Sequence, residues 1–179
     1  GDYRPDPHKF PDLRRHVDEL HALGLNVLLW HAPLCVAPAS RAYHELRHLL
    51  IHDEAGEFIS VNGLAQLCPA SPAVRRYVAE ETIRLMRSTG VDGLKVDLFN
   101  CLPAGLCVSS EHDHDPAEPL AALEAVMAAQ WEAMRRVRPD ALCELKQDYG
   151  NVRLARYGTM VRAGDTAYDV DTNCRRCFH

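Results

Sequence analysis

The stretch that decides the fold is VDGLKVDLF, residues 91–99, which directly follows a helical segment ending at Gly90. It is short and apolar enough to form a buried strand. Side chains alternate between the two faces of a strand. One face would carry Leu94, Val96 and Leu98, and the other Gly93, Lys95 and Asp97. A cation and a carboxylate on the inner face of a core strand are costly unless they pair or take part in chemistry. Two interpretations remain open: a structural Lys95–Asp97 pair, or a catalytic carboxylate steadied by a neighbouring cation.

The composition is that of an ordinary soluble globular domain. The chain has 179 residues, of which 47% are hydrophobic and 25% are charged, and its formal net charge is −5. Because there is no basic footprint, neither nucleic acid nor an anionic membrane is expected as a partner. No apolar run approaches the ~20 residues that a membrane span needs.

The seven cysteines are an odd number, so they cannot all pair with one another. Cys68, Cys101 and Cys143 lie in or next to core-like segments, which favours a reduced, cytoplasmic protein. Residues 174–177 have CxxC spacing, but a lone pair of this kind is weak support for zinc. Residues 111–115, EHDHD, are expected to be a solvated loop because no further ligand pattern accompanies them. The sequence therefore predicts no metal site and no cofactor.

Helices and strands alternate along the chain. Helical periodicity is present in the second half of residues 6–24 and over residues 72–90, 120–137 and 151–157. Strand-like apolar runs occupy residues 25–30, 91–99, 141–147 and 159–163. Long polar connections, which are expected to be functional or to carry small elements of their own, span residues 33–70 and 100–115. This alternation predicts a parallel sheet with helices outside it.

Loop lengths favour a TIM barrel. The connections that follow strands are long, whereas those from helix back to strand are tight, which is typical of a barrel whose active site lies beyond the strand C-termini. A doubly wound open sheet would usually carry a glycine-rich loop after its first strand, but WHAP occupies residues 30–33. A full barrel has eight strands in typically ~250 residues. With four strands, residues 1–179 are expected to form a single partial (β/α) barrel domain, completed by the rest of a barrel or by a homo-oligomeric partner.

Three carboxylates fall at or near the C-terminal ends of successive strands: Asp97, Glu144 and Asp165. In a barrel these ends converge on one pocket, and two carboxylates across a sugar ring are the minimum machinery of glycoside hydrolysis. Lys95 is expected to lower the pKa of Asp97 and keep it ionised, as a nucleophile must be. Arg162 is placed to hold a carboxylate or a substrate hydroxyl.

These residues resemble the α-galactosidase (melibiase) superfamily of retaining glycoside hydrolases. GLKVD at residues 93–97 resembles the strand-four signature of that superfamily. FPDL at residues 10–13, LHALGLNV at residues 20–27 and Trp30 are similar to its helix two and strand three, and RAGDT at residues 162–166 is similar to its acid/base segment. The resemblance runs from the end of strand two to just past strand six, which is essentially the whole chain.

The resemblance implies a retaining hydrolase of α-galactoside-type substrates that needs no cofactor. Asp97 would be the nucleophile and Asp165 the acid/base, with their carboxyl groups about 5–5.5 Å apart. Substrate-binding residues are expected to be Lys95, Glu144, Arg162, Trp30 and Asp2. Two roles for Trp30 agree equally well with the sequence: packing in the core as an aromatic residue, or stacking on the face of a sugar.

Two other functions remain open. One is a different barrel carbohydrate enzyme, such as an α-glucosidase, an α-N-acetylgalactosaminidase or a transglycosylase. The other is an inactive fragment or metal-binding module that uses Cys174, Cys177, His112 and His114.

Overall fold

A computed structural model of the chain describes residues 2–99, 107–147, 152–163, 170–171 and 174–175. Its main sheet has four parallel strands in the order β1-β5-β6-β7. The strands are β1 (Leu28–His31), β5 (Gly93–Val96), β6 (Leu142–Gln147) and β7 (Met160–Ala163). Three of the four strands lie within the runs predicted from the sequence, and β1 extends one residue beyond its run, to His31. The parallel pairing is as predicted.

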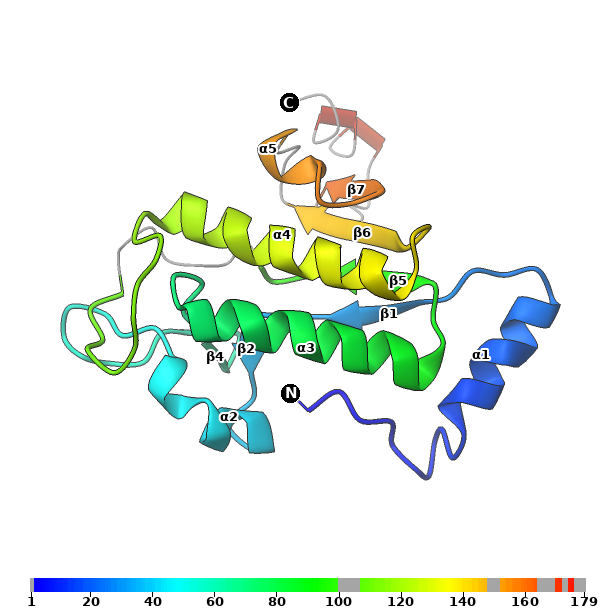
Figure 1. Cartoon of the computed structure of the whole chain (residues 1–179), viewed down its shortest axis with the longest axis horizontal. Coiled ribbons are helices and arrows are strands. Elements are labelled where there is room, and N and C mark those ends of the chain that lie inside the picture. Colours follow the sequence, from blue (N-terminus) through cyan, green and yellow to red (C-terminus); the bar gives the residue numbers. More distant parts are fainter. Residues whose placement is uncertain (1, 100–106, 148–151, 164–169, 172–173, 176–179) are drawn as a thin grey trace.

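Two long helices, α3 (Pro72–Thr89) and α4 (Pro119–Val137), run in the same direction and lie side by side against one face of this sheet (Figure 1). Helix α3 begins with a proline in its first turn, where no backbone N–H is needed, and ends at Gly90, which adopts φ 76°. The shorter α1 (Leu13–Ala22) precedes β1, and α5 (Val152–Ala155) connects β6 to β7. The element order therefore agrees with the alternation expected from the sequence.

The two faces of the sheet differ in chemistry. On the helix side, Leu94, Val96 and Leu145 are completely buried beneath α3 and α4. On the opposite side, Lys95 and Glu144 are only partly buried. A sheet with one apolar covered face and one polar face toward a common interior is the arrangement expected for part of a (β/α) barrel.

The end of β5 differs from the expected regular strand. Leu98 does not continue the apolar face of Leu94 and Val96, because the strand stops at Val96 and Leu98 adopts φ 54°. This left-handed conformation is unfavourable for a side chain with a Cβ atom. Phe99, rather than Leu98, is the fully buried residue beyond the strand. The chain therefore turns sharply immediately after Asp97.

The long connection after β1 carries small elements of its own, as predicted. These are β2 (Cys35–Val36), α2 (Arg41–Glu45), the 3-10 helix η1 (Arg47–Leu49), β3 (Ser60–Val61) and β4 (Leu64–Gln66). The three short strands form an antiparallel sheet in the order β2-β4-β3. This excursion lies at the C-terminal end of β1, beside the loop that leads from β5 into α4 (Figure 1).

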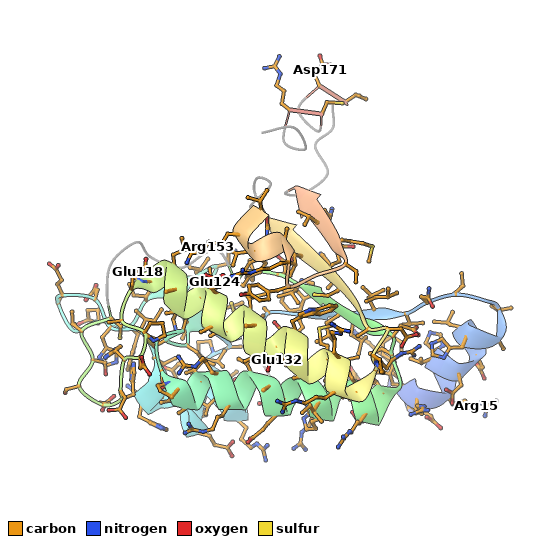
Figure 2. All side chains as sticks on the ribbon, turned by 45° about the horizontal axis from the view of Figure 1, so that its top comes forward. Arg15, Glu118, Glu124, Glu132, Arg153 and Asp171 are labelled. Atoms are coloured by element: carbon orange, nitrogen blue, oxygen red, sulfur yellow. The ribbon has the colours of Figure 1, made fainter. Side chains whose placement is uncertain are left out.

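Helix α5 is fastened to α4 by polar contacts (Figure 2). Glu124, from the second turn of α4, accepts hydrogen bonds from Arg153 Nε at 2.7 Å and from the Tyr157 hydroxyl at 3.1 Å. Arg156 also pairs with Glu124. These contacts hold the β6–β7 connection against the outer helix layer. Within the described ranges, no helix is both long and apolar enough to cross a bilayer.

Candidate active site

The candidate site is built around Asp97, the first residue after β5. Its backbone N–H donates to the carbonyl oxygen of His31 at 2.9 Å, which extends the pairing between β1 and β5 by one residue. The residue is only 7% exposed. A carboxylate at the C-terminal end of a parallel strand, buried to this degree, lies where barrel enzymes place their catalytic groups.

Four donors surround the Asp97 carboxylate. Trp30 Nε1 donates to Oδ2 at 2.9 Å, and the backbone N–H of Leu98 donates to Oδ1 at 2.8 Å. Lys95 Nζ lies 3.4 Å from Oδ2, and Lys146 Nζ lies 3.4 Å from Oδ1. Each carboxylate oxygen therefore receives one neutral N–H donor and one ammonium group.

Strand register brings these donors together. Trp30 in β1 and Glu144 in β6 both pair with Lys95 in β5, so the three side chains are neighbours on the inner face. Lys146 follows Glu144 by two residues and points to the same face. It therefore reaches the level of Asp97, one step beyond the end of β5.

The surroundings hold the pKa of Asp97 below its usual value. Partial burial acts to raise the pKa, but the hydrogen bond from Trp30 and the amide of Leu98 outweigh it, followed by the charges of Lys146 and Lys95. The expectation that Lys95 lowers this pKa is confirmed, although its contribution is the smallest of the four. The carboxylate is ionised at neutral pH.

Lys146 and the indole of Trp30 are contacts that sequence reasoning missed. Lys146 was detectable in principle, because it lies two residues after Glu144 on a predicted strand and so shares its face. Trp30 was expected to meet a sugar or the core, whereas the structure gives its N–H to Asp97. The residue remains 45% exposed, so its hydrogen bond to Asp97 does not bury it completely.

Two further predicted site residues, Glu144 and Arg162, lie on the inner face of the sheet, and a third lies outside the described residues. Glu144 lies in β6 beside Lys95, and Arg162 in β7 pairs in register with Lys146, so both lie on the inner face. Asp165 lies outside the described residues, and its separation from Asp97 stays a prediction.

Asp2 has a local role at a helix end. Its carboxylate accepts from the backbone N–H groups of Arg41 at 3.1 Å and Ala42 at 2.9 Å, at the start of α2. These two amides are the orphan donors of a first helical turn, and they lower the pKa of Asp2. The expected contact between Asp2 and substrate stays a prediction.

The metal-binding alternative is not supported in the form proposed from the sequence. Among the residues that the structure describes, Cys174 does not join His112 and His114 in a cluster of potential ligands, and Cys177 lies outside them. The interpretation of residues 111–115 as a simple solvated loop is wrong for the two histidines, which are partly buried and lie close to two other cysteines. The loop folds back onto the excursion after β1, which sequence spacing does not reveal.

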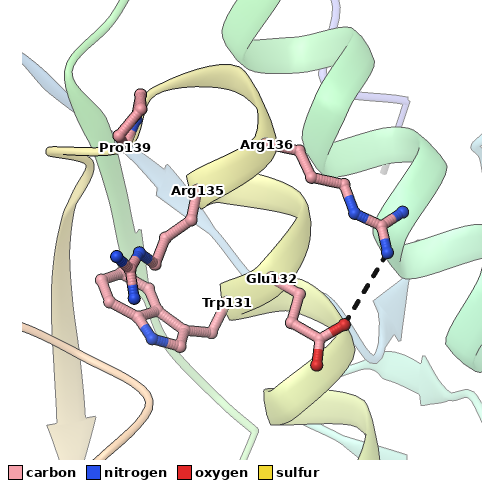
Figure 3. A pocket seen from close by; sticks show the side chains of 5 residues that line it. All are labelled: Trp131, Glu132, Arg135, Arg136 and Pro139. Atoms are coloured by element: carbon pink, nitrogen blue, oxygen red, sulfur yellow. Dashed lines mark ion pairs between the residues drawn. The ribbon is translucent and has the colours of Figure 1, made fainter.

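A separate surface depression of 360 Å³ lies on the last turns of α4 (Figure 3). It is lined by Trp131, Glu132, Arg135, Arg136 and Pro139. The Arg135 guanidinium lies 5.8 Å from the centre of the Trp131 ring, and Glu132 pairs with Arg136 at 3.8 Å. Because α4 ends where β6 begins, this depression is at the opposite end of the strands from Asp97. It is therefore not part of the candidate site.

Comparison with known proteins agrees with the resemblance in the motifs. No protein-family model matches the chain. A relative from Flavonifractor plautii, named A type blood alpha-D-galactosamine galactosaminidase, is 26% identical over 196 residues, covering 98% of this chain and 18% of the relative. A probable alpha-galactosidase C from Aspergillus flavus is 28% identical over 124 residues, covering 64% of this chain and 16% of the relative. The chain therefore spans less than a fifth of the length of these curated relatives.

A solved structure supports the fold. The GH36 alpha-galactosidase AgaA from Geobacillus stearothermophilus, in complex with stachyose, matches with a TM-score of 0.79 at 16% identity. The match covers 97% of this chain and 24% of that chain. The predicted fold class, an α/β partial TIM barrel, is confirmed by this likeness. The predicted resemblance to the α-galactosidase superfamily is confirmed as well, since curated relatives and structural neighbours are α-galactosidase-type glycosidases.

Proposed function

We propose that this chain is part of the catalytic barrel of a retaining glycoside hydrolase that acts on α-galactoside-type substrates. The observation that carries the proposal is the environment of Asp97: an ionised carboxylate at a strand C-terminus, held by Trp30, Lys95 and Lys146. The names of the relatives support the substrate class, and the partial length of the chain makes the activity a property of the whole protein.

In the proposed reaction, Asp97 is the nucleophile of a double displacement. A carboxylate oxygen of Asp97 forms a bond to the anomeric carbon as the bond from that carbon to the leaving oxygen breaks, and Asp165 gives its proton to the leaving oxygen. Asp165 then takes a proton from water, whose oxygen attacks the anomeric carbon and releases Asp97 as a free carboxylate. Two inversions give net retention.

In this scheme, the four donors around Asp97 prepare its carboxylate for attack. They keep the carboxylate ionised and fix its orientation before substrate arrives, so that little reorganisation is needed when it attacks. Lys95 and Lys146 each contact one carboxylate oxygen. In the ester intermediate the carboxylate charge is neutralised, and both ammonium groups become available to substrate hydroxyls. Glu144 and Arg162, on the same face, are proposed to bind further hydroxyls.

The test is hydrolysis of p-nitrophenyl α-galactoside by the protein and by Asp97→Ala, with sodium azide added. Loss of a nucleophile is expected to reduce kcat/KM by on the order of 10⁴-fold. Azide should restore turnover of this activated substrate and yield the β-galactosyl azide, because the small anion attacks directly from the face that Asp97 occupied. Asp18→Asn is the matched control, since Asp18 is an exposed carboxylate on α1.

The product decides the role of Asp97. A β-configured azide assigns Asp97 as nucleophile, whereas an Asp97→Ala protein that remains folded and keeps its activity contradicts the proposal. For Asp165→Asn, hydrolysis of substrates with poor leaving groups should fall much more than hydrolysis of aryl substrates, because only the former need the proton.

The Flavonifractor relative favours a second candidate substrate. Its name specifies an α-D-galactosamine sugar, and the match extends over 98% of this chain. Assays that add the aryl α-galactosaminide and the aryl α-N-acetylgalactosaminide to the aryl α-galactoside distinguish the two candidate substrate classes. If kcat/KM is higher for either amino sugar than for the galactoside, the enzyme prefers a nitrogen substituent at C2 of the sugar to a hydroxyl group there.

A further inference from the structure

Four potential metal ligands converge where two loops meet, away from the described contacts of Asp97. They are Cys68, Cys107, His112 and His114, and one ligand atom from each lies within 4.8 Å of every other. Cys107 Sγ and His112 Nε2 are 3.7 Å apart. In a tetrahedral zinc site with ordinary bond lengths, a thiolate sulfur and an imidazole nitrogen are about 3.6 Å apart. The separation of Cys107 and His112 is therefore the one expected across a zinc ion.

The ligand types also match zinc. Two cysteines and two histidines form a common structural zinc set, and soft thiolates disfavour magnesium and calcium. Four protein ligands leave no open position, which is the property of a structural rather than a catalytic site. Cys68 is 1% exposed, so the site is partly withdrawn from solvent.

Neighbouring groups orient the ligands. His112 Nδ1 lies 2.7 Å from the carbonyl oxygen of His48 and donates to it, which leaves Nε2 facing Cys107. A hydrogen bond from the second ring nitrogen to a carbonyl is the usual support of a metal-bound histidine. The backbone N–H of His52 donates to Cys107 Sγ at 3.4 Å, as amides do around metal-bound thiolates. His114 Nε2 is buried and has no hydrogen-bond partner among the residues described.

The two thiols hydrogen-bond to each other, and this contact shifts their pKa values in opposite directions. The pKa of Cys107 is lowered, first by the hydrogen bond from Cys68 and then by the His52 amide, against the effect of burial. The pKa of Cys68 is raised, because its proton is the one shared with Cys107 and because it is buried. The amides of Ala70 and Ser71 act in the opposite direction on Cys68. Coordination of zinc by the two sulfurs would release the thiol protons.

The backbone holds the two loops in this arrangement without the metal. Val108 N–H donates to the carbonyl oxygen of His52 at 3.1 Å, and Asp115 N–H donates to that of Ala70 at 2.8 Å. The first loop belongs to the excursion between β1 and α3, and the second leads from β5 to α4. Both lie at the C-terminal ends of the strands, the end that carries Asp97 (Figure 1).

We propose that Cys68, Cys107, His112 and His114 bind one zinc ion in a closed structural site. The ion would fasten the loop that follows Asp97 to the excursion that follows β1, and so stabilise the rim of the candidate active site. This inference does not depend on the proposed hydrolase activity, because occupancy and activity are measured separately.

The first experiment measures zinc in the protein purified without an affinity tag and under reducing conditions. About one zinc per chain is expected from elemental analysis, and reconstitution with cobalt should produce the sulfur-to-cobalt charge-transfer band and the intense visible bands of a tetrahedral site. Cys68→Ser and Cys107→Ser should lose the metal and these bands. The matched control is Cys174→Ser, an exposed cysteine outside the cluster, which should keep both.

Two histidine variants provide a second test that does not rely on the cysteine substitutions. His112→Ala should lower zinc occupancy several-fold, whereas His44→Ala, an exposed histidine on α2, should not change it. For the unmutated protein, removal of zinc by a chelator should speed proteolysis within residues 107–118 while circular dichroism in the helical region is retained.

Four results would overturn the site. The first is a chain that takes up no zinc or cobalt in the reduced state. The second is metal that is retained in Cys107→Ser. The third is metal that is lost equally from Cys174→Ser. A Cys68–Cys107 disulfide in freshly purified protein, found by mass spectrometry together with an absence of metal, would assign the two thiols to a covalent crosslink instead.

Discussion

At the scale of single residues, the two ends of β5 carry aspartates with different roles. Asp92, before the strand, accepts from the Val27 amide at 2.7 Å and pairs with His21 at 2.8 Å and Arg138 at 2.7 Å. Those partners come from the N-terminal side of the sheet, where barrel residues serve stability. Asp97 faces the opposite end and the polar interior. Both aspartates have lowered pKa values, so position rather than pKa separates the structural carboxylate from the candidate nucleophile.

The Trp30→Phe variant tests the hydrogen bond to Asp97. The substitution keeps an aromatic ring but removes the N–H that stabilises the charged carboxylate, so the pKa of Asp97 should rise. The measurement is an NMR titration of the aspartate carboxyl carbons, and the acidic limb of kcat/KM should move to higher pH with it. The control is Trp131→Phe on the outer surface of α4, which should leave both unchanged. An unmoved Asp97 titration would remove Trp30 from the site.

Lys146→Met tests the second cation. Its ammonium group is 3.4 Å from Asp97 Oδ1 and belongs to a side chain that is 17% exposed. Losing one of the two cations should lower kcat/KM by about 10- to 100-fold, because the nucleophile is held less firmly. Lys9→Met, on the exposed N-terminal segment, should have no effect. If Lys146→Met left kcat/KM unchanged, Lys95 and Trp30 would suffice to position the carboxylate.

At the scale of elements, the closeness of β5 to β6 depends on a glycine. A Cβ atom at Gly93 would lie 1.6 Å from the backbone carbonyl oxygen of Leu142, on the strand that pairs with it. Backbone atoms of a central strand cannot move aside as a flexible side chain can. Gly93 therefore permits the register that places Lys146 beside Asp97.

Gly93→Ala should destabilise the protein by about 3 kcal/mol or more, measured by urea unfolding. Gly158→Ala is the comparison, because a methyl group there meets Leu145 Cγ at 2.8 Å and the Cys143 carbonyl oxygen at 3.1 Å, a much smaller overlap than the one at Gly93. That variant should lose about 1 kcal/mol. Equal losses in the two variants would contradict the proposed role of the β5–β6 approach.

At the scale of the whole molecule, a buried histidine couples stability to pH. His31, on the helix side of β1, is 1% exposed, and its Nδ1 accepts from Gln130 Nε2 of α4 at 2.8 Å. Desolvation lowers the pKa of His31 to about 3. The unfolded chain binds this proton near pH 6.5 and the folded chain does not, so acidification favours unfolding.

Between pH 7 and pH 5, His31 should remove about 2 kcal/mol from the free energy of unfolding. His31→Asn retains an acceptor for Gln130 but cannot titrate, so its stability should change less with pH over this range. Chemical denaturation at several pH values measures the slope, and His8→Asn, on the exposed N-terminal segment, is the control. Asp92 and Asp97 have lowered pKa values in the folded protein, so their protonation reduces the free energy of unfolding only at lower pH. An identical slope in His31→Asn would show that His31 does not supply the linkage.

Local patterns sufficed to predict the order of elements, since the alternation of apolar residues along 72–90 or 91–97 depends only on neighbours in the chain. Asp97 and Lys95 were identified in the same way, because a strand end can be recognised from the sequence. The Lys146 contact, the indole hydrogen bond of Trp30 and the four-residue cluster at Cys68 required the tertiary structure. Each depends on strand register or on the packing of one loop against another. Those long-range pairings are set by hydrogen bonds and burial across the whole fold, and no local pattern in the chain encodes them.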